Sequence, residues 1–444
     1  MPFVRRRAGL TQAHRLDGRR RPGSRGPAAS IVAVAVIGAV FGLATLGVDP
    51  LGLGGLGAGS GAERTTGPSP ADGLPSRPPT PPPIPGHEVY GFVPYWEMDG
   101  GIAAHLAETN LTTIGLFSVT HHSDGRMAVR QTGFKRIAGG IGQTLIAEAR
   151  ARGTRIEVVY SSFGEDKNRA FYANEAAQAR WIEELVAFTV EHGFDGINVD
   201  VEGLPPDLVP AYGTWVGRLA EALRVALPEG QVSVATQANQ RGAMMAAVAA
   251  ASGADRVFLM GYDYRVARSQ PGASAPIDRN DGEERDLRWS LDTYASLGVP
   301  ADRTLLGLPL YGVTWPVSGP GLGAPSLGRG DTWVPRRNLA TIERESFDPL
   351  YDEIESVEFY AVPADGVDPS DPPSLPPNPG PGDAPWHAVY FDSPRSLTPK
   401  LLLADERGLA GAGFWAIGYE RGLPGYTELI DTFRAGELEQ LALE

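Results

Sequence analysis

From residue 88 onward, eight short runs of β-branched and other apolar residues alternate with longer segments of helical periodicity. This alternation limits the folds that the chain can adopt, because strands that alternate with helices are joined by parallel crossovers. Eight such units fit an α/β fold, a (β/α)8 TIM barrel, which typically takes ~250 residues plus insertions. The predicted strands are Val89–Pro94, Thr113–Val119, Arg155–Ser161, Asp195–Val201, Gln231–Thr236, Arg256–Tyr262, Thr304–Leu310 and Gly411–Ala416.

An open doubly wound sheet is the main alternative to the barrel, since it also alternates strands with helices. A nucleotide-binding sheet of that kind carries a glycine-rich phosphate loop after its first strand, and no such loop follows Val89–Pro94. The barrel is therefore favoured. The helical segments expected around it include Ala173–His192, Asp207–Ala226, Gly242–Ala251, Glu284–Leu297 and Ser396–Arg407.

The stretch between the last two predicted strands is long, and we expect a small α+β insertion at about residues 313–394. It begins with glycine-rich sequence, contains a mixed helical and extended region near Leu339–Ala361, and includes nine prolines from Pro363 to Pro385. Proline favours extended backbone, so we predict an extended or disordered loop here. With this insertion the barrel covers residues 88–433, and residues 434–444 form a C-terminal tail.

Residues 29–48 form a run of twenty residues without a charged side chain. As a helix, the run would span about 30 Å, the thickness of the hydrocarbon core of a bilayer. Residues 1–28 hold eight Arg and one Asp and would stay in the cytoplasm as a basic tail. We expect a single-pass membrane anchor with the barrel outside. A cleaved signal that leaves a secreted protein is the alternative, and a buried core helix is disfavoured.

Residues 49–87 lack the composition of a packed core. The first part is rich in glycine, and nine prolines follow between Pro68 and Pro85. Glycine-rich chains are flexible, whereas proline-rich chains are extended and semi-rigid. We predict a linker that holds the barrel away from the membrane.

Charge and cysteine content exclude several classes of function. The chain has no Cys, which excludes disulfides, thiolate metal sites and a Cys nucleophile. Its formal net charge is −14, and residues 1–28 are net basic with eight Arg and one Asp, so the remainder is more acidic still. Nucleic-acid binding requires a basic face. We therefore expect no nucleic-acid partner.

The fourth predicted strand carries three polar side chains on one face. Side chains alternate between the two faces of a strand, so Asn198, Asp200 and Glu202 point into the barrel while the residues between them point outward to the helices. Polar groups inside a barrel cost free energy unless they are paired or used. Reacting groups of such barrels lie at the carboxyl ends of the strands. The pattern therefore indicates a catalytic site with Glu202 at its mouth.

Two neighbouring carboxyl groups are suited to acid–base catalysis. The pKa of Glu202 should be raised beside Asp200, because like charges disfavour joint ionisation. A protonated Glu202 at the mouth could then give its proton to a leaving oxygen. A cluster of structural salt bridges is the alternative explanation for the same carboxylates.

The run from Asp195 to Glu202 resembles the strand-four motif D-G-x-D-x-D-x-E of glycoside hydrolase family 18, the chitinase-like barrels. Asn198 stands where most chitinases have Asp, and this feature resembles the bacterial spore-cortex and cell-wall N-acetylglucosaminidase branch. No LysM module, which that branch often carries, is apparent. Further segments that resemble the family or this branch are Gly91–Trp96, Met260–Tyr264, Phe414–Ala416, Leu308–Gly312 and Val389–Ser393.

The resemblance implies retaining hydrolysis in which the 2-acetamido group of the sugar replaces an enzyme nucleophile. On this basis Glu202 is the acid and base, and Asp200 orients the acetamide and stabilises its developing charge. Tyr262 would donate a hydrogen bond to the acetamide carbonyl. Asp263 would support the same part of the site.

Other residues receive supporting roles. Asn198, Gln237, Trp415, Tyr95 and Trp96 are predicted to bind substrate, and the aromatic residues among them could instead be ordinary core residues. Asn239 is a weaker candidate for substrate contact. The side chain of Asp195 is not one of the inward-facing ones, and it should brace the strand through backbone N–H groups. The pair His121–His122 has no third ligand at metal spacing, so we expect neither a metal nor a cofactor.

Together these features predict a glycoside hydrolase, N-acetylglucosaminidase-like or chitinase-like, that acts on β-1,4-linked N-acetylglucosamine glycans. Peptidoglycan is the favoured polymer and chitin the second. A non-hydrolysing carbohydrate-binding barrel is the alternative. Such proteins of the family usually lose the acid at the position of Glu202, which this chain retains.

Overall fold

The structure is a computed structural model that describes residues 86–339 and 349–438. The predicted basic tail, the run at 29–48 and almost all of the linker therefore lie outside the described residues. Within the described ranges, no helix is both long enough and apolar enough to cross a membrane.

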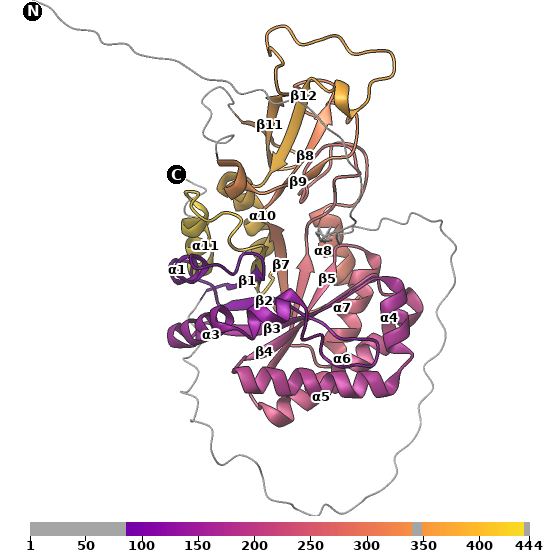
Figure 1. The fold of residues 1–444 in the computed structure, drawn as a ribbon, viewed down its shortest axis with the longest axis vertical. Helices are drawn as coiled ribbons and strands as arrows, with labels where there is room; N and C mark the ends of the chain where they lie inside the picture. Colours follow the sequence, from indigo (N-terminus) through magenta and orange to yellow (C-terminus); the bar gives the residue numbers. More distant parts are fainter. Residues whose placement is uncertain (1–85, 340–348, 439–444) are drawn as a thin grey trace, which may run out of the picture. The chain divides into compact units, whose positions relative to one another are not determined.

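Eight parallel strands close into a barrel in the order β1-β13-β7-β6-β5-β4-β3-β2 (Figure 1). Each of the eight predicted runs forms one of these strands, and the predicted TIM-barrel fold is confirmed. The bounds of β2 are as predicted, and those of the other strands differ from the predicted ones by one or two residues. The strands are β1 (Glu88–Pro94), β2 (Thr113–Val119), β3 (Arg155–Phe163), β4 (Gly196–Glu202), β5 (Gln231–Gln237), β6 (Arg256–Met260), β7 (Thr304–Pro309) and β13 (Gly411–Trp415).

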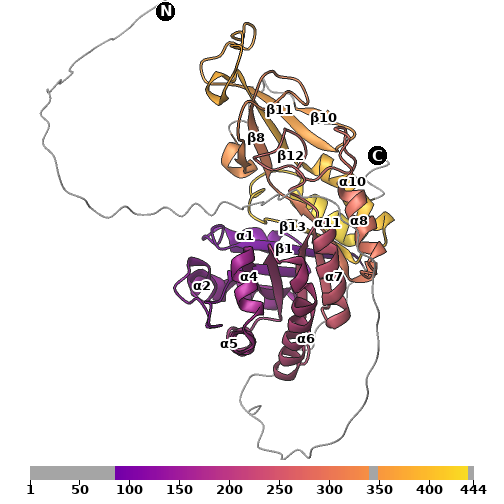
Figure 2. The same ribbon diagram turned by 90° about the vertical axis from the view of Figure 1, so that its right-hand side faces the viewer.

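Helices cover the outside of the barrel, and Figure 2 shows α6 and α7 side by side along it, with α5 packed against α6. Helix α5 begins where the Asn174 side chain accepts the backbone N–H of Ala177, and it ends at Gly193, whose φ of 78° suits glycine. The helices are α1 (Ile102–Glu108), α2 (Thr132–Ile137), α3 (Gly140–Arg152), α4 (Glu165–Tyr172), α5 (Glu175–His192), α6 (Val209–Ala226), α7 (Gln240–Ser252), α8 (Leu287–Ser296), α10 (Pro394–Glu406) and α11 (Tyr426–Ala435). Short 3-10 turns are Pro206–Leu208, Ala301–Arg303, Pro335–Asn338 and Pro381–Asp383.

Large side chains fill the barrel interior where neighbouring strands supply glycine. Phe258 is completely buried there, with Tyr90 and Phe92 packed against it at ring-centroid distances of 5.7 and 4.8 Å. A Cβ at Gly307 would lie 2.3 Å from the Phe258 ring, and one at Gly413 would lie 2.5 Å from it. The interior is thus a packed core below the site and not a pore.

The insertion between β7 and β13 is a five-stranded antiparallel sheet with the order β10-β11-β12-β8-β9. The second proline tract connects β11 to β12, and the backbone N–H of Ala364 closes the base of this loop on Pro385 O at 3.0 Å. The expected mixed region lies partly outside the described residues, and its described part forms strands. The strands are β8 (Gly312–Val317), β9 (Asp331–Trp333), β10 (Leu350–Asp352), β11 (Val357–Pro363) and β12 (Trp386–Phe391).

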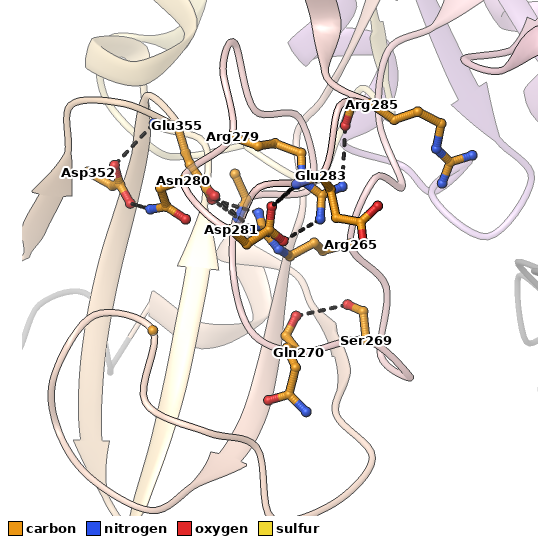
Figure 3. A network of polar contacts seen from close by, with 12 residues as sticks. Arg265, Ser269, Gln270, Arg279, Asn280, Asp281, Glu283, Arg285, Asp352 and Glu355 are labelled. Carbon is orange, nitrogen blue, oxygen red and sulfur yellow. Dashed lines mark hydrogen bonds and ion pairs between the residues drawn. The ribbon is translucent and has the colours of Figure 1, made fainter.

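A buried ionic network joins this sheet to the loop that follows β6 (Figure 3). Arg265, which is 3% exposed, pairs with Glu355 at 2.7 Å and with Asp281 at 2.9 Å. Arg279 pairs with the same Asp281 at 2.5 Å. Because breaking a buried pair leaves an uncompensated charge, the network holds the loop firmly against the insertion.

Candidate active site

Strand β4 places Asn198, Asp200 and Glu202 in the barrel interior, as the alternation of its side chains predicts. Asn198 is completely buried and Asp200 is 5% exposed, while Glu202 lies at the more open end of the strand. The intervening residues Ile197, Val199 and Val201 belong to the apolar layer between strands and helices. The alternation of side chains along β4 therefore places one amide and two carboxyl groups in a row that leads to the mouth of the barrel.

The carboxyl groups of Asp200 and Glu202 hold their protons more tightly than ordinary carboxyl groups. Burial, and next the charge of Asp263, raise the pKa of Glu202 to about 7, against the hydrogen bond that Gln237 Nε2 donates to Glu202 Oε2 at 2.9 Å. Burial, and next the charge of Glu202, raise the pKa of Asp200 well above its usual range. At neutral pH the pair can therefore supply a proton at the mouth.

Tyr262 and Asp263 follow β6 and reach the same place. Burial raises the pKa of Tyr262 well above its usual range, and the charges of Asp200, Asp263 and Glu202 add to the effect. The phenol of Tyr262 thus remains a hydrogen-bond donor beside the carboxyl pair.

Asp263 is held in an unusual backbone conformation with φ of 62°. Its backbone N–H donates to Ser274 Oγ at 3.1 Å, and the Tyr311 hydroxyl donates to its Oδ1. Burial raises the pKa of Asp263, against the hydrogen bond from Tyr311. Strain of this kind persists where surrounding contacts enforce it, which is common at functional sites.

An aromatic cluster of Trp96, Phe117 and Trp415 lines the barrel beside these groups. The ring centroid of Trp415, at the end of β13, lies 4.8 Å from that of Phe117 and 6.2 Å from that of Trp96. Trp96 Nε1 donates to the Tyr419 hydroxyl at 3.0 Å, and Tyr95 packs edge-on against Trp96 at 4.9 Å. Trp96, Tyr95 and Trp415 are all only partly buried.

Two residues that the sequence analysis did not assign belong to this site. Tyr311 holds Asp263, and although its segment was noted for its resemblance, it received no role. Phe163 ends β3 in register with Glu202, stacks on Phe117 at 6.3 Å and is 44% exposed. Alternation along β3 would have placed Phe163 on the inner face if the predicted strand had continued to it.

Other expected residues have structural contacts. Asp195 Oδ2 accepts the backbone N–H of Ile156 at 3.0 Å, a contact of the kind expected for a residue that braces the strand. Asn239 caps helix α7 through its side chain. His121 is buried, which lowers its pKa to about 4, and its Nδ1 contacts His122 O. The part of the chain that the structure describes contains no group of three or more His, Asp or Glu side chains able to hold a metal ion.

Comparison with known proteins gives one family. The sequence model of "Glycosyl hydrolases family 18" matches residues 89–420. The chain is 26% identical over 325 residues to a "Cortical fragment-lytic enzyme" of Bacillus subtilis, covering 71% of this chain and 67% of that protein. It is 22% identical over 314 residues to an "Endochitinase" of Brugia malayi, covering 62% of this chain and 56% of that protein.

Among solved structures, the chain is similar to a family 18 N-acetylglucosaminidase from Paenibacillus barengoltzii. The TM-score is 0.62 at 20% sequence identity, and the match covers 79% of this chain and all of that one. At this identity the likeness establishes a shared fold.

Proposed function

The chain belongs to glycosyl hydrolases family 18 and is a glycoside hydrolase, and we propose that it cleaves β-1,4-linked N-acetylglucosamine glycans with retention, using the acetamido group of the substrate. The observation that carries this proposal is the carboxyl pair of Asp200 and Glu202, with the pKa of Glu202 raised to about 7 at the barrel mouth. A retaining enzyme with its own nucleophile would use a carboxylate ionised at working pH. Burial disfavours that form of Asp200.

In the first step, the acetamido oxygen of the bound sugar attacks its anomeric carbon while Glu202 gives its proton to the glycosidic oxygen. The bond to the leaving sugar breaks, and an oxazolinium ion forms with Glu202 ionised. Asp200 accepts the acetamide N–H and stabilises the positive charge, and Tyr262 donates a hydrogen bond to the acetamide oxygen. Trp415 supports the apolar face of the same sugar.

In the second step, Glu202 removes a proton from water as the water attacks the anomeric carbon. The oxazolinium ring opens, the acetamido group is restored and Glu202 regains its proton. Two inversions at one carbon leave the product with the β configuration of the substrate. Gln237 keeps the Glu202 carboxyl in place through both steps.

Peptidoglycan is the favoured polymer and chitin the second. The relative from Bacillus subtilis is named for lysis of cortical fragments, and the one from Brugia malayi is named as a chitinase. Lys167 adds a physical argument: its Nζ donates to Thr120 Oγ1 at 2.6 Å, and Thr120 donates to Ser161 O at 2.7 Å, one strand from Asp200. This ammonium group has no carboxylate partner within the described chain, which suits the anionic groups of peptidoglycan.

We also propose that residues 29–48 anchor the enzyme in the cell membrane with the barrel outside. The run is uncharged and follows eight Arg, and a glycan of the cell wall is reached only from outside the cytoplasm. Release after cleavage of the same run is the alternative.

Digestion of two polymers tests the proposal. The full chain and its Glu202→Gln variant are incubated with purified peptidoglycan and with chitin oligomers, and released fragments are weighed by mass spectrometry. We expect fragments with reducing N-acetylglucosamine ends from the wild type and none from the variant. A Lys167→Met variant should lose rate on peptidoglycan and keep it on chitin oligomers. Glycan binding without fragments from either protein would support the carbohydrate-binding barrel instead.

A further inference from the structure

A fourth carboxyl group lies inside the barrel, below the site, and the reaction described above makes no use of it. Glu157 on β3 is 2% exposed. Its Oε2 accepts hydrogen bonds from the Tyr90 hydroxyl at 3.0 Å and from Ser233 Oγ at 2.5 Å. Ser233 Oγ in turn accepts a hydrogen bond from Asn198 Nδ2 at 2.7 Å. A continuous chain of hydrogen bonds therefore runs from Glu157 to the residue directly beneath Asp200 on the inner face of β4.

The barrel interior is shaped to hold this chain. A Cβ at Gly115 would lie 2.5 Å from the Tyr90 hydroxyl, and one at Gly196 would lie 3.2 Å from Glu157 Oε1. Gly196 is the β4 residue in register with Glu157. Burying a carboxyl group is costly, and burial outweighs the hydrogen bonds to Glu157 and the charge of Arg155, so its presence beneath a catalytic pair calls for a role.

The hydrogen-bond chain has a fixed direction when Glu157 is ionised. A carboxylate can only accept, so it takes the single hydroxyl proton of Ser233. Ser233 Oγ can then only accept from Asn198, which requires the NH₂ end of that amide. The amide oxygen of Asn198 is left as the free end. Asn198 Oδ1 and Asp200 Oδ1 are both buried and have no hydrogen-bond partner within the described residues.

We propose that Glu157 is a positioning residue for hydrolysis, which through Ser233 fixes the amide of Asn198 so that its oxygen accepts the proton of Asp200. The inference rests on the proposed function, in which Asp200 must present the right atom to the acetamide N–H. When protonated Asp200 donates a hydrogen bond to the amide oxygen of Asn198, the other carboxyl oxygen of Asp200 is free to accept the acetamide N–H. The fixed amide of Asn198 thereby accepts the hydrogen bond from Asp200, whereas a second carboxyl group at this position would share the proton with Asp200.

The charges around Glu157 decide when this direction holds. Arg155, on the same strand, favours the ionised form, and Asp255, which Arg224 pairs with at 2.9 Å, disfavours it. The pair of Arg256 and Glu88 faces it from β6 and β1. Burial outweighs these and raises the pKa of Glu157 to about 7. When Glu157 is protonated, its carboxyl group can donate a hydrogen bond, and the hydroxyl of Ser233 no longer has to donate to it. The orientation of the Asn198 amide is therefore enforced mainly at pH values above about 7.

The variant Glu157→Gln tests the inference, because glutamine keeps the shape and carries a permanent donor. We expect kcat to fall by roughly tenfold at about pH 8, as for a misplaced catalytic group, with KM little changed because no substrate reaches this depth. The loss should be smaller at about pH 6, where the wild type is itself protonated. In an Asn198→Ala background, Glu157→Gln should have no further effect on kcat.

Ser233→Ala serves as the second variant, since it breaks the same link without touching the carboxyl group, and it should reproduce the loss. Circular dichroism and thermal melting check that each full-length variant folds. An equal loss at both pH values, or independent effects of Glu157→Gln and Asn198→Ala, would overturn the inference and leave a purely structural role. Full activity of Glu202→Gln would instead overturn the proposed function, so the two failures are distinguishable.

Discussion

Asp195, Asp200 and Glu202 lie on or beside one strand, yet their side chains meet different surroundings. Asp195 binds a backbone N–H group outside the barrel interior, whereas burial keeps protons on Asp200 and Glu202. The alternation of side chains along the strand distinguishes Asp195 from the inward-facing Asp200 and Glu202 from sequence alone. The pairing of Gln237 with Glu202 could only be guessed, because it depends on how β4 and β5 are staggered.

The pH dependence of activity should follow the pKa of Glu202, which Asp263 and Gln237 shift in opposite directions. The charge of Asp263 raises the pKa of Glu202 and the hydrogen bond from Gln237 lowers it. The acid form is needed, so kcat/KM of the wild type should fall as pH rises through about 7. Asp263→Asn should move this alkaline limb to lower pH, and Gln237→Met should move it to higher pH.

Full pH profiles of kcat/KM for the three proteins check this prediction. Shifts of both variants in the same direction would contradict the assignment of the limb to Glu202.

Phe163 should bind a sugar ring next to the bond that is cleaved. It is exposed, stacked on Phe117 and in register with Glu202, and aromatic rings of this kind stack well on the apolar faces of sugars. Phe163→Ala should raise KM for chitin oligomers severalfold with a smaller change in kcat. Val225→Ala, at a site 81% exposed on α6, is the matched control and should change neither constant. An unchanged KM for Phe163→Ala would place the residue outside the binding site.

At the scale of elements, the barrel strands and the presence of the insertion were predictable, and the strand pairing inside the insertion was not. Parallel barrel strands are buried on both faces and read as apolar runs, which is why all eight were found. The antiparallel strands of the insertion are short and lie among glycine and proline, and although β10 and β11 form a local hairpin, β12 pairs with β11 and β8 across longer stretches of sequence. Nothing local to β8 predicts that Trp315 will lie opposite Ala388 on β12.

Glycine positions inside the barrel should be sensitive to the smallest substitution. Gly307→Ala would place a Cβ 2.3 Å from the Phe258 ring, and overpacking of this kind costs about 1–3 kcal/mol. Gly140→Ala at the start of α3 meets no atom within 4 Å and should be neutral or slightly stabilising, because alanine favours helices. Urea unfolding of the two variants and the wild type measures the difference. Equal stabilities would show that the interior is not closely packed around Phe258.

At the scale of the whole molecule, sequence reasoning reaches residues that the structure does not describe. The run at 29–48 should keep the full chain in the membrane fraction of cells that express it, with the barrel open to external protease. Mass measurement of the mature N-terminus distinguishes the two proposals for this run. A chain that starts at Met1 supports the anchor, whereas a chain that starts beyond residue 48 contradicts it and supports a secreted enzyme.

The central claim is retaining hydrolysis in which the acetamido group of the substrate acts as nucleophile and Glu202 acts as acid and base. The initial anomer of the released sugar tests it most directly, because the configuration is set at the reacting carbon before mutarotation scrambles it. The full chain is mixed with chitin oligomers and the anomeric protons are followed by NMR from the first minutes. The account predicts that the β anomer forms first, and no anomer should form with Glu202→Gln. Initial release of the α anomer would mean direct attack by water and would contradict the mechanism.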